Sequence, residues 1–295
     1  MLVGDDFGKK IAERLGMAFV PFEDRKFTDG EICPRILFKE VPKAGDDIVL
    51  AINKHADESI NDYTLKVYFM ARTLYDMGLK IKLVFPYFSY ARQDKVFRQG
   101  EPLSSNYVAQ MFDPIVADFI TVTAHLQRRA SIAPLFKHAR ATNVSGVPAL
   151  IRGLPKIENP YILGPDTESI HQSKKMAEMM GASDYGAFTK VRDVDTGAIH
   201  VSTGDIQLEG RNVVIVDDMV STGGTVLKGI ELARKLGARQ IHIAFVHAIL
   251  AGRALEKIKN MKPDSIVGAN TMESPVSVAD VTPEIAGELK KMVSG

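Results

Sequence analysis

The chain has 295 residues, of which 45% are hydrophobic and 25% charged, a composition typical of a globular protein. Because this length exceeds the usual size of one domain, two domains of about 150 residues are expected. The 37 basic and 36 acidic residues nearly cancel, which gives no general attraction to nucleic acid or membranes, and the single cysteine excludes an internal disulfide and a cysteine-cluster metal site. The sequence predicts no signal peptide and no membrane span, so a cytoplasmic protein is expected.

Helices and strands are predicted to alternate through the first half of the chain. Ser59 to Asp76 has the spacing of an amphipathic helix, and Gly78 follows it as a helix terminator. Ser104 is expected to be the N-cap of a helix that runs to Phe112. The other elements expected here are a helix near Gly8 to Leu15 and strands at Ile48 to Ile52, Lys80 to Phe85 and Asp118 to Thr123.

Three loops of this half carry side chains that suit a ligand. Arg25 to Glu31 contains an aromatic residue, two acids and a glycine, although this composition is also typical of a solvated turn. Pro86 to Lys95, with Arg98 beyond it, combines aromatic faces that suit a base with cations that suit a polyphosphate. The alternative is that these aromatic residues close the sheet. His125 follows a predicted strand and is either a metal or phosphate ligand or a structural histidine.

A second series of strands and helices begins near residue 146. Its first strand, Tyr161 to Gly164, leads to Pro165 and Asp166. Between Lys190 and Gly204 the sequence is polar, which predicts either a loop that closes over a reaction or a surface hairpin. The remaining elements expected here are helices at Glu168 to Met180, Ala251 to Asn260 and Thr282 to about Val293, and strands at Tyr185 to Thr189, Ala238 to His247 and Ser265 to Val267.

The run from Val213 to Val226 carries the strongest functional signal. Its four opening β-branched residues predict a strand buried on both faces of a parallel sheet, and Asp217 and Asp218 follow them. The turn into the next helix consists of Ser221, Thr222, Gly223, Gly224 and Thr225. Ligands of open α/β sheets bind beyond the carboxyl ends of strands, and free N–H groups at a helix start suit a phosphate. Paired acids accept hydrogen bonds from sugar hydroxyls or hold a cation. The run therefore predicts a receptor for a phosphorylated sugar, the alternative being a tight turn beside an incidental acidic pair.

This run also resembles the PRPP-binding motif shared by type I phosphoribosyltransferases and PRPP synthetases. Phe27 to Glu31 and Pro86 to Lys95 resemble motifs of the ribose-phosphate pyrophosphokinase (PRPP synthetase) family, in the same order and at similar spacing, and ordinary phosphoribosyltransferases lack them. Gly100 to Ser105 and the short length resemble the archaeal form, and the resemblance covers essentially the whole chain.

The resemblance implies an α/β fold of two similar type I phosphoribosyltransferase-like domains, each a mostly parallel sheet flanked by helices. Residues 1–145 plus 282–295 would form the ATP side, and residues 146–281 the ribose 5-phosphate and PRPP side. The implied reaction transfers the pyrophosphoryl group of ATP to the 1-hydroxyl of ribose 5-phosphate. It gives PRPP and AMP for nucleotide biosynthesis, with Mg²⁺ as cofactor.

The matching motifs also imply roles for individual residues. Those implied to bind ATP are Phe27, Asp29 and Glu31, donated by a neighbouring subunit of a homo-oligomer, together with Arg92, Gln93, Asp94 and His125. His125 and Asp166 match positions that contact the metal or metal-bound ATP. Lys190 and Arg192 match the catalytic pair that stabilises the transferred group. Asp217 and Asp218 are implied to hold the ribose hydroxyls, and Ser221, Thr222, Gly223, Gly224 and Thr225 the 5-phosphate.

The chain departs from the family pattern at three places. Ser221 and Thr123 stand where the family usually has acids, and Glu168-Ser169 replace a pair of glycines. Archaeal forms tolerate the serine, whereas Thr123 and Glu168-Ser169 leave open one alternative, a non-catalytic paralogue that regulates an active enzyme, although such a protein has less use for the catalytic pair and the paired acids. A second alternative is a phosphoribosyltransferase, in which the two N-terminal motifs would lack a role.

Overall fold

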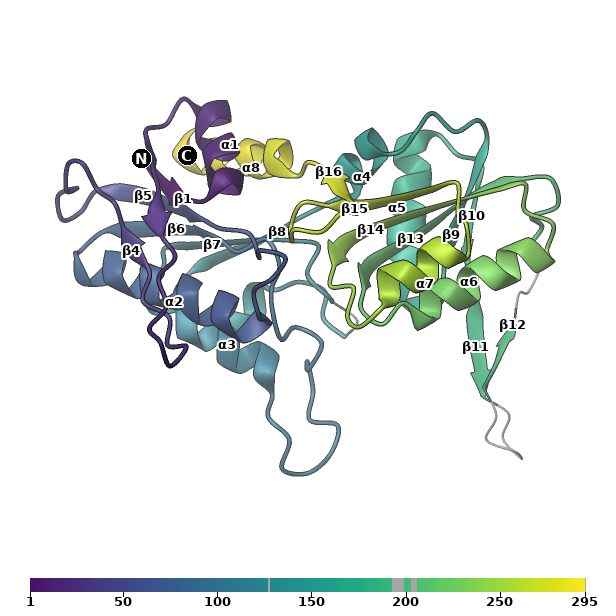
Figure 1. Ribbon diagram of the computed structural model, residues 1–295, viewed down its shortest axis with the longest axis horizontal. Coiled ribbons are helices and arrows are strands. Elements are labelled where there is room, and N and C mark those ends of the chain that lie inside the picture. The colour runs from purple at the N-terminus through teal and green to yellow at the C-terminus, as the bar shows by residue number, and fades with distance from the viewer. Residues whose placement is uncertain (127, 193–198, 203–205, 295) are drawn as a thin grey trace. The chain divides into compact units, whose positions relative to one another are not determined.

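The computed structural model describes residues 1–126, 128–192, 199–202 and 206–294. The chain divides into two compact units (Figure 1). The first contains Met1–Ser145, Thr271–Glu273 and Thr282–Gly295, and the second contains Gly146–Asn270 and Ser274–Val281. Every helix in the described ranges falls short of the length and apolarity needed to cross a bilayer.

A six-stranded sheet forms the centre of the first unit. Its strand order is β2-β1-β5-β6-β7-β8, and all neighbouring pairs are parallel. Parallel strands covered on both faces need apolar residues throughout, and β7 is accordingly buried along its whole length. The strands are β1 (Leu2–Gly4), β2 (Phe19–Val20), β5 (Asp47–Ala51), β6 (Lys80–Val84), β7 (Asp118–Val122) and β8 (Arg140–Val144).

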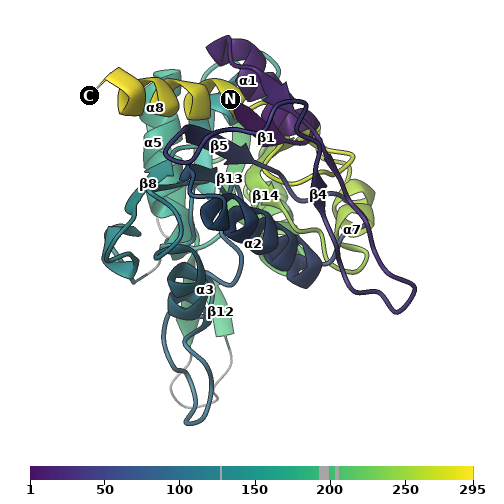
Figure 2. The same ribbon diagram turned by 90° about the vertical axis from the view of Figure 1, so that its left-hand side faces the viewer.

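Helices cover both faces of this sheet: α1 (Asp6–Leu15) and α8 (Thr282–Ser294) lie on one face, and α2 (Ile60–Asp76) and α3 (Ser104–Phe112) lie on the other (Figures 1 and 2). Ser59 is the N-cap of α2, and its side chain accepts a hydrogen bond from the Asp62 N–H. The prediction that Ser104 caps α3 was wrong. Ser104 is the first helical residue, because the carbonyl of Leu103 already accepts hydrogen bonds from the next turn.

A hairpin formed by β3 (Phe22–Glu23) and β4 (Arg35–Ile36) projects from the first unit (Figure 2). Lys66, on α2, has a fully buried side chain that connects the base of the hairpin to this helix. Lys66 Nζ lies 2.7 Å from Asp24 and 2.6 Å from Glu58, and 5.8 Å from the centroid of the Phe22 ring. These contacts set where the hairpin leaves the sheet.

The second unit is built in the same way. Its sheet has the order β10-β9-β13-β14-β15-β16, again with parallel neighbours. Figure 1 shows α4 (Val147–Gly153) and α5 (Ile170–Met180) on one face and α6 (Gly224–Lys235) and α7 (Ala254–Asn260) on the other. The strands are β9 (Pro160–Gly164), β10 (Asp184–Ala187), β13 (Asn212–Val220), β14 (Gln240–Ala248), β15 (Ser265–Ala269) and β16 (Ser277–Ala279). The predicted fold class, two α/β domains with mostly parallel sheets, is confirmed.

The polar segment after residue 189 contains two short antiparallel strands, β11 (Thr189–Arg192) and β12 (Ile199–Ser202). The backbone of the described residues therefore forms a hairpin, and its closure over a reaction stays a prediction. Residues 193–198 and 203–205 of this segment lie outside the described part of the chain.

Each sheet has one point where the winding reverses, between β1 and β5 in the first unit and between β9 and β13 in the second. Such switch points are where open α/β sheets bind ligands. In the first unit, this position receives Thr271–Glu273: Glu273 N–H donates to the Lys54 carbonyl at 2.8 Å, and His55 Nδ1 lies 3.2 Å from the Glu273 carboxylate. His55 Nε2 also lies 3.5 Å from Asp5. At the first switch point, acidic side chains are therefore paired with His55. The second switch point has a different set of side chains, described below.

Candidate active site

Asp217 and Asp218 lie where β13 continues beyond its neighbour β9. The pairing between these strands ends at Ile215 opposite Leu163, whereas β13 stays paired with β14 as far as Val220. Beyond Gly164, which is still paired with Ala187 of β10, the chain leaves the sheet and turns toward α5. The two acids therefore stand at the open side of the switch point, within β13 and not after it as expected, because the pairing with β14 carries the strand on to Val220.

A hydrogen-bonded acidic cluster fills this position. Asp217 Oδ1 accepts hydrogen bonds from Ser169 Oγ at 2.8 Å and from the Asp218 N–H at 2.9 Å. Asp166 Oδ1 accepts from the Glu168 N–H at 3.1 Å and lies 3.4 Å from Ser169 Oγ. Burial and the nearby charges of Asp218 and Asp166 raise the pKa of Asp217 well above its ordinary value, while the Ser169 hydroxyl opposes the rise. Such a site favours a ligand that donates hydrogen bonds or brings positive charge.

The turn between β13 and α6 presents backbone N–H groups. Gly223 is the N-cap, at a φ of 79° that favours glycine, and no side chain caps the helix. A Cβ atom added at Gly224 would meet nothing within 4 Å, so the space beside the first turn is open. Ser221 and Thr225 are half-buried and Thr222 is exposed. The N-terminus of a helix with free N–H groups attracts anions, so the turn suits a phosphate.

Lys190 and Arg192 lie on β11, where their backbones pair with Val201 and Ile199 of β12. Their side chains fall outside the described part of the chain. The predicted catalytic role of this pair therefore stays a prediction.

In the first unit, the loop after β6 divides into a buried part and an exposed part. Tyr87 and Phe88 are buried, and the Phe88 ring packs on Phe119 with centroids 5.4 Å apart. These two aromatics close the sheet, so the alternative in which they stack a base is wrong for them. Arg92 is exposed, and Gln93 Nε2 donates to Glu101 at 3.1 Å.

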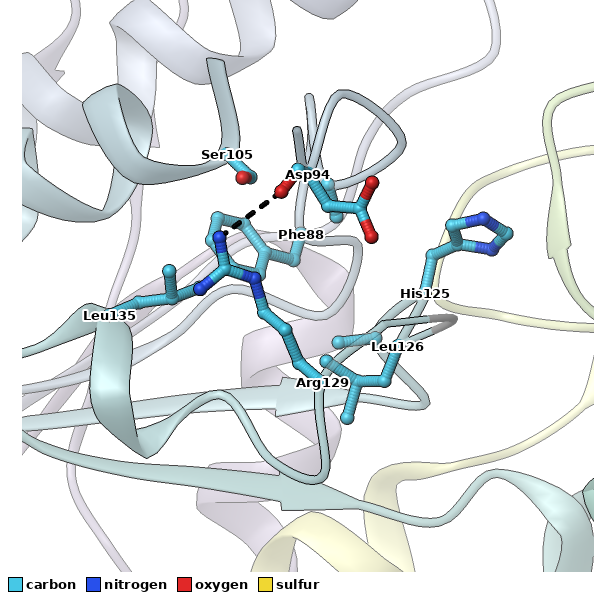
Figure 3. A pocket seen from close by; sticks show the side chains of 9 residues that line it. Phe88, Asp94, Ser105, His125, Leu126, Arg129 and Leu135 are labelled. Carbon is cyan, nitrogen blue, oxygen red and sulfur yellow. Dashed lines mark hydrogen bonds between the residues drawn. The ribbon is translucent and has the colours of Figure 1, made fainter. Parts of the chain in front are cut away.

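Asp94 lies at the centre of a polar network that the sequence did not reveal (Figure 3). Its side chain is 3% exposed and pairs with Arg128 at 2.8 Å. Arg129 donates to the Asp94 carbonyl at 3.3 Å and to Asn106 at 2.8 Å. Two adjacent arginines just beyond His125 are the sequence signal that could have identified this network.

A small cavity of about 10 Å³ lies beside this network, with His125, Asp94 and Arg129 among its lining residues. That is room for about one water-sized group. Two strained residues flank the region: Tyr90 with φ 63° and Thr123 with φ 42°, in the loops after β6 and β7. Strain of this kind in non-glycine residues clusters at functional sites. The ATP-binding role of these loops stays a prediction.

The hairpin loop presents Phe27, whose side chain is 53% exposed. Three hydrogen bonds close the loop: Phe27 N–H donates to the Glu31 carbonyl at 2.8 Å, Gly30 N–H donates to the Phe27 carbonyl at 3.0 Å, and Asp29 Oδ1 accepts from Glu31 N–H at 3.1 Å. Asp29 and Glu31 are exposed beside it. The structure therefore brings the three predicted adenine-contacting residues together on one projecting loop.

The donor set fits a cation that arrives with a substrate. Among the side chains described, no group of three or more His, Cys, Asp or Glu residues could hold a metal ion. Mg²⁺ usually keeps several waters and takes one or two protein ligands plus substrate phosphates. His125 in the first unit and Asp166 in the second fit such a role, whereas a structural metal would need a fuller set of ligands.

Comparison with known proteins identifies the family. Residues 4–115 match the N-terminal domain of ribose phosphate pyrophosphokinase, and residues 149–281 match the phosphoribosyl transferase domain. A ribose-phosphate pyrophosphokinase of Pyrococcus furiosus is 31% identical over 89% of this chain and 90% of its own length. Ribose-phosphate pyrophosphokinase 2 of Archaeoglobus fulgidus is 32% identical over 94% of both chains. The chain belongs to the ribose-phosphate pyrophosphokinase family. It is therefore an enzyme that forms PRPP for nucleotide biosynthesis.

The fold agrees with this assignment. The crystal structure of a phosphoribosylpyrophosphate synthetase from Mycobacterium smegmatis matches with a TM-score of 0.84, at 22% identity, over 100% of this chain and 98% of that one. The predicted resemblance to ribose-phosphate pyrophosphokinases, and to their archaeal members, is confirmed. Of the alternatives, neither the phosphoribosyltransferase nor the non-catalytic paralogue gains support from these relatives.

Proposed function

We propose that this enzyme forms PRPP by transferring the pyrophosphoryl group of ATP to the 1-hydroxyl of ribose 5-phosphate, with AMP as second product and Mg²⁺ as cofactor. The observation that carries the proposal is the acidic cluster beside the uncapped start of α6. One ligand with adjacent hydroxyls and a phosphate satisfies both features, and ribose 5-phosphate has both.

The second unit is assigned the sugar. Asp217 and Asp218 accept hydrogen bonds from the ribose hydroxyls, in addition to those that Asp217 already accepts from Ser169 and the Asp218 N–H. The 5-phosphate lies against the N–H groups and hydroxyls of Ser221 to Thr225. The attraction between an anion and a helix N-terminus supports this placement.

The first unit is assigned ATP. Arg92, Gln93, Asp94 and His125 belong to the two loops that leave the carboxyl ends of β6 and β7. The roles differ between them: exposed Arg92 is suited to phosphate, whereas buried Asp94 acts through Arg128. We assign the projecting Phe27 loop, with Asp29 and Glu31, to the adenine of a neighbouring subunit in a homo-oligomer. The exposure of Phe27 on a hydrogen-bonded, projecting loop supports this assignment.

In the reaction, the 1-hydroxyl oxygen of the sugar forms a bond to the β-phosphorus of ATP. The bond from that phosphorus to the oxygen bridging to the α-phosphate breaks, AMP leaves, and the hydroxyl proton is released. When bound, Mg²⁺ would compensate phosphate charge, and His125 of the first unit and Asp166 of the second are each assigned a contact with the metal or with metal-bound phosphate. Lys190 and Arg192 are assigned to stabilise the negative charge that develops on the transferred pyrophosphoryl group. Losing one such cation should lower the rate about 10²–10³-fold.

The test is AMP release from purified protein with ATP, Mg²⁺ and ribose 5-phosphate, compared with the same mixture without sugar. Asp217→Asn should abolish most sugar-dependent AMP formation. Asp46→Asn is the matched control, because Asp46 is an exposed carboxylate that accepts a hydrogen bond from the Lys43 N–H. No AMP despite binding of both ligands would contradict the proposal and favour a non-catalytic paralogue.

A further inference from the structure

Ser169 places a buried hydroxyl between two carboxylates of the second unit. The residue is 2% exposed, and its Oγ lies 2.8 Å from Oδ1 of Asp217 and 3.4 Å from Oδ1 of Asp166. A serine hydroxyl has one proton, so the shorter contact identifies Asp217 as the acceptor. Ser173 Oγ donates to the Ser169 carbonyl at 3.1 Å, the ordinary contact of a helical serine with the residue four positions before it.

The end of β9 leaves room for this side chain. A Cβ atom added at Gly164 would lie 3.1 Å from the Ser169 Cβ and 3.0 Å from the Ala187 Cβ. Both distances are shorter than ordinary van der Waals contact, so a larger residue at position 164 would displace Ser169. The serine is therefore packed into the site by its neighbours.

The hydroxyl determines how Asp217 faces a ligand. Among the described residues, the two groups that donate to Asp217 are Ser169 Oγ and the Asp218 N–H, and both reach Oδ1. Two donors on one oxygen fix the plane of the carboxylate and leave Oδ2 as the oxygen available to a ligand. Without the hydroxyl, the charges of Asp166 and Asp218 would turn the carboxylate away from this orientation.

We propose that Ser169 is a positioning residue for the sugar: it holds Oδ1 of Asp217 so that Oδ2 accepts a hydrogen bond from one ribose hydroxyl. This rests on the ribose 5-phosphate site proposed above and adds a source of sugar specificity to it. Two glycines, which the family pattern usually has in place of Glu168-Ser169, would supply no side-chain donor. In this chain the side chain of Ser169 supplies a donor to Asp217.

The test compares sugars as well as variants. Binding of ribose 5-phosphate, 2-deoxyribose 5-phosphate and 3-deoxyribose 5-phosphate is measured by calorimetry on the full-length protein and on Ser169→Ala and Asp217→Asn. Ser173→Ala is the matched control, because it removes a buried hydroxyl from the same helix that does not contact Asp217. Affinity for ATP is measured on every variant, and circular dichroism checks that each one folds.

Ser169→Ala should weaken ribose 5-phosphate about tenfold, as expected for losing a hydrogen bond to a charged group. The same variant should weaken binding of the deoxy sugar that lacks the hydroxyl bound by Asp217 by less than about twofold. The ratio of the affinities for ribose 5-phosphate and this deoxy sugar should therefore fall, as it should in Asp217→Asn. Ser169→Thr, which keeps the hydroxyl, should restore part of the discrimination. Equal weakening of all three sugars would overturn the positioning role and leave a general structural one. Failure of the unaltered protein to bind any of the sugars would instead overturn the ribose site itself.

Discussion

Replacing Lys66 with methionine should destabilise the first unit and release its hairpin. The lysine is fully buried, and its partner Glu58 has a side chain that is 9% exposed, whereas Asp24 is 42% exposed and can turn to water. Lys66→Met therefore leaves one buried carboxylate, Glu58, without its cation. Breaking a buried pair in this way costs roughly 3 kcal/mol.

Hydrogen–deuterium exchange of peptides from α2 and the hairpin measures this cost within the first unit, which global unfolding of a two-unit chain would not isolate. A loss of roughly 3 kcal/mol corresponds to about 100-fold less protection. Lys26→Met is the control, because the ion pair of Lys26 with Asp62 at 2.6 Å is exposed, and it should change protection little. Lys66→Met combined with Glu58→Leu should recover most of the loss. Equal loss in the single and double variants would refute the charge argument and assign the effect to packing of the lysine stem.

Three further predictions concern the site and its surroundings. Gly223→Ala forces a side chain to the left-handed φ of 79°, so it should lower the midpoint of urea unfolding by an amount equivalent to about 1–2 kcal/mol and raise the KM for ribose 5-phosphate more than that for ATP. Lys190→Ala should lower kcat sharply while the Kd for ATP, measured by calorimetry, stays nearly unchanged; equal loss of both would make Lys190 a ground-state ligand. A hydrogen bond with Asp5, helped by the charge of Glu273, raises the pKa of His55 above its ordinary 6.5 despite burial. The stability that His55 adds is therefore fully present below pH 6.5 and lost as the pH rises through the higher folded value, so unfolding midpoints of the protein and of His55→Gln should converge at alkaline pH.

Much of the fold could be predicted because its signals are local. Val213 to Val216 read as a strand buried on both faces, and all four are fully buried in β13. The helix expected over Ser59 to Asp76 is α2, and Ser59 is its N-cap. The start of α3 was misplaced by one residue, because serine is compatible with both the cap and the first turn, and the main-chain hydrogen bonds of Leu103 decide between them.

The sequence predicted individual residues of the candidate site, but it did not predict the hydrogen bonds and ion pairs between them. Asp217 was identified by its position after a strand, but its contact with Ser169 joins residues 48 apart in the chain and depends on the order of β9 and β13 in the sheet. Arg128 was missed because its role depends on burial of Asp94, which the polar sequence around that residue does not indicate. Tyr87 was ambiguous because an aromatic after a strand can face either the core or a ligand.

The placement of α8 has a consequence for synthesis. This helix packs on α1 and its Thr282 hydroxyl accepts a hydrogen bond from Arg14 at 2.8 Å, so the first unit is completed by residues that are translated after the second unit. The second unit needs nothing beyond Val281. Domains usually fold in the order in which they leave the ribosome. Here the N-terminal unit must wait, with one face of its sheet incompletely covered, while the whole second unit is made, and the second can reach its native state first.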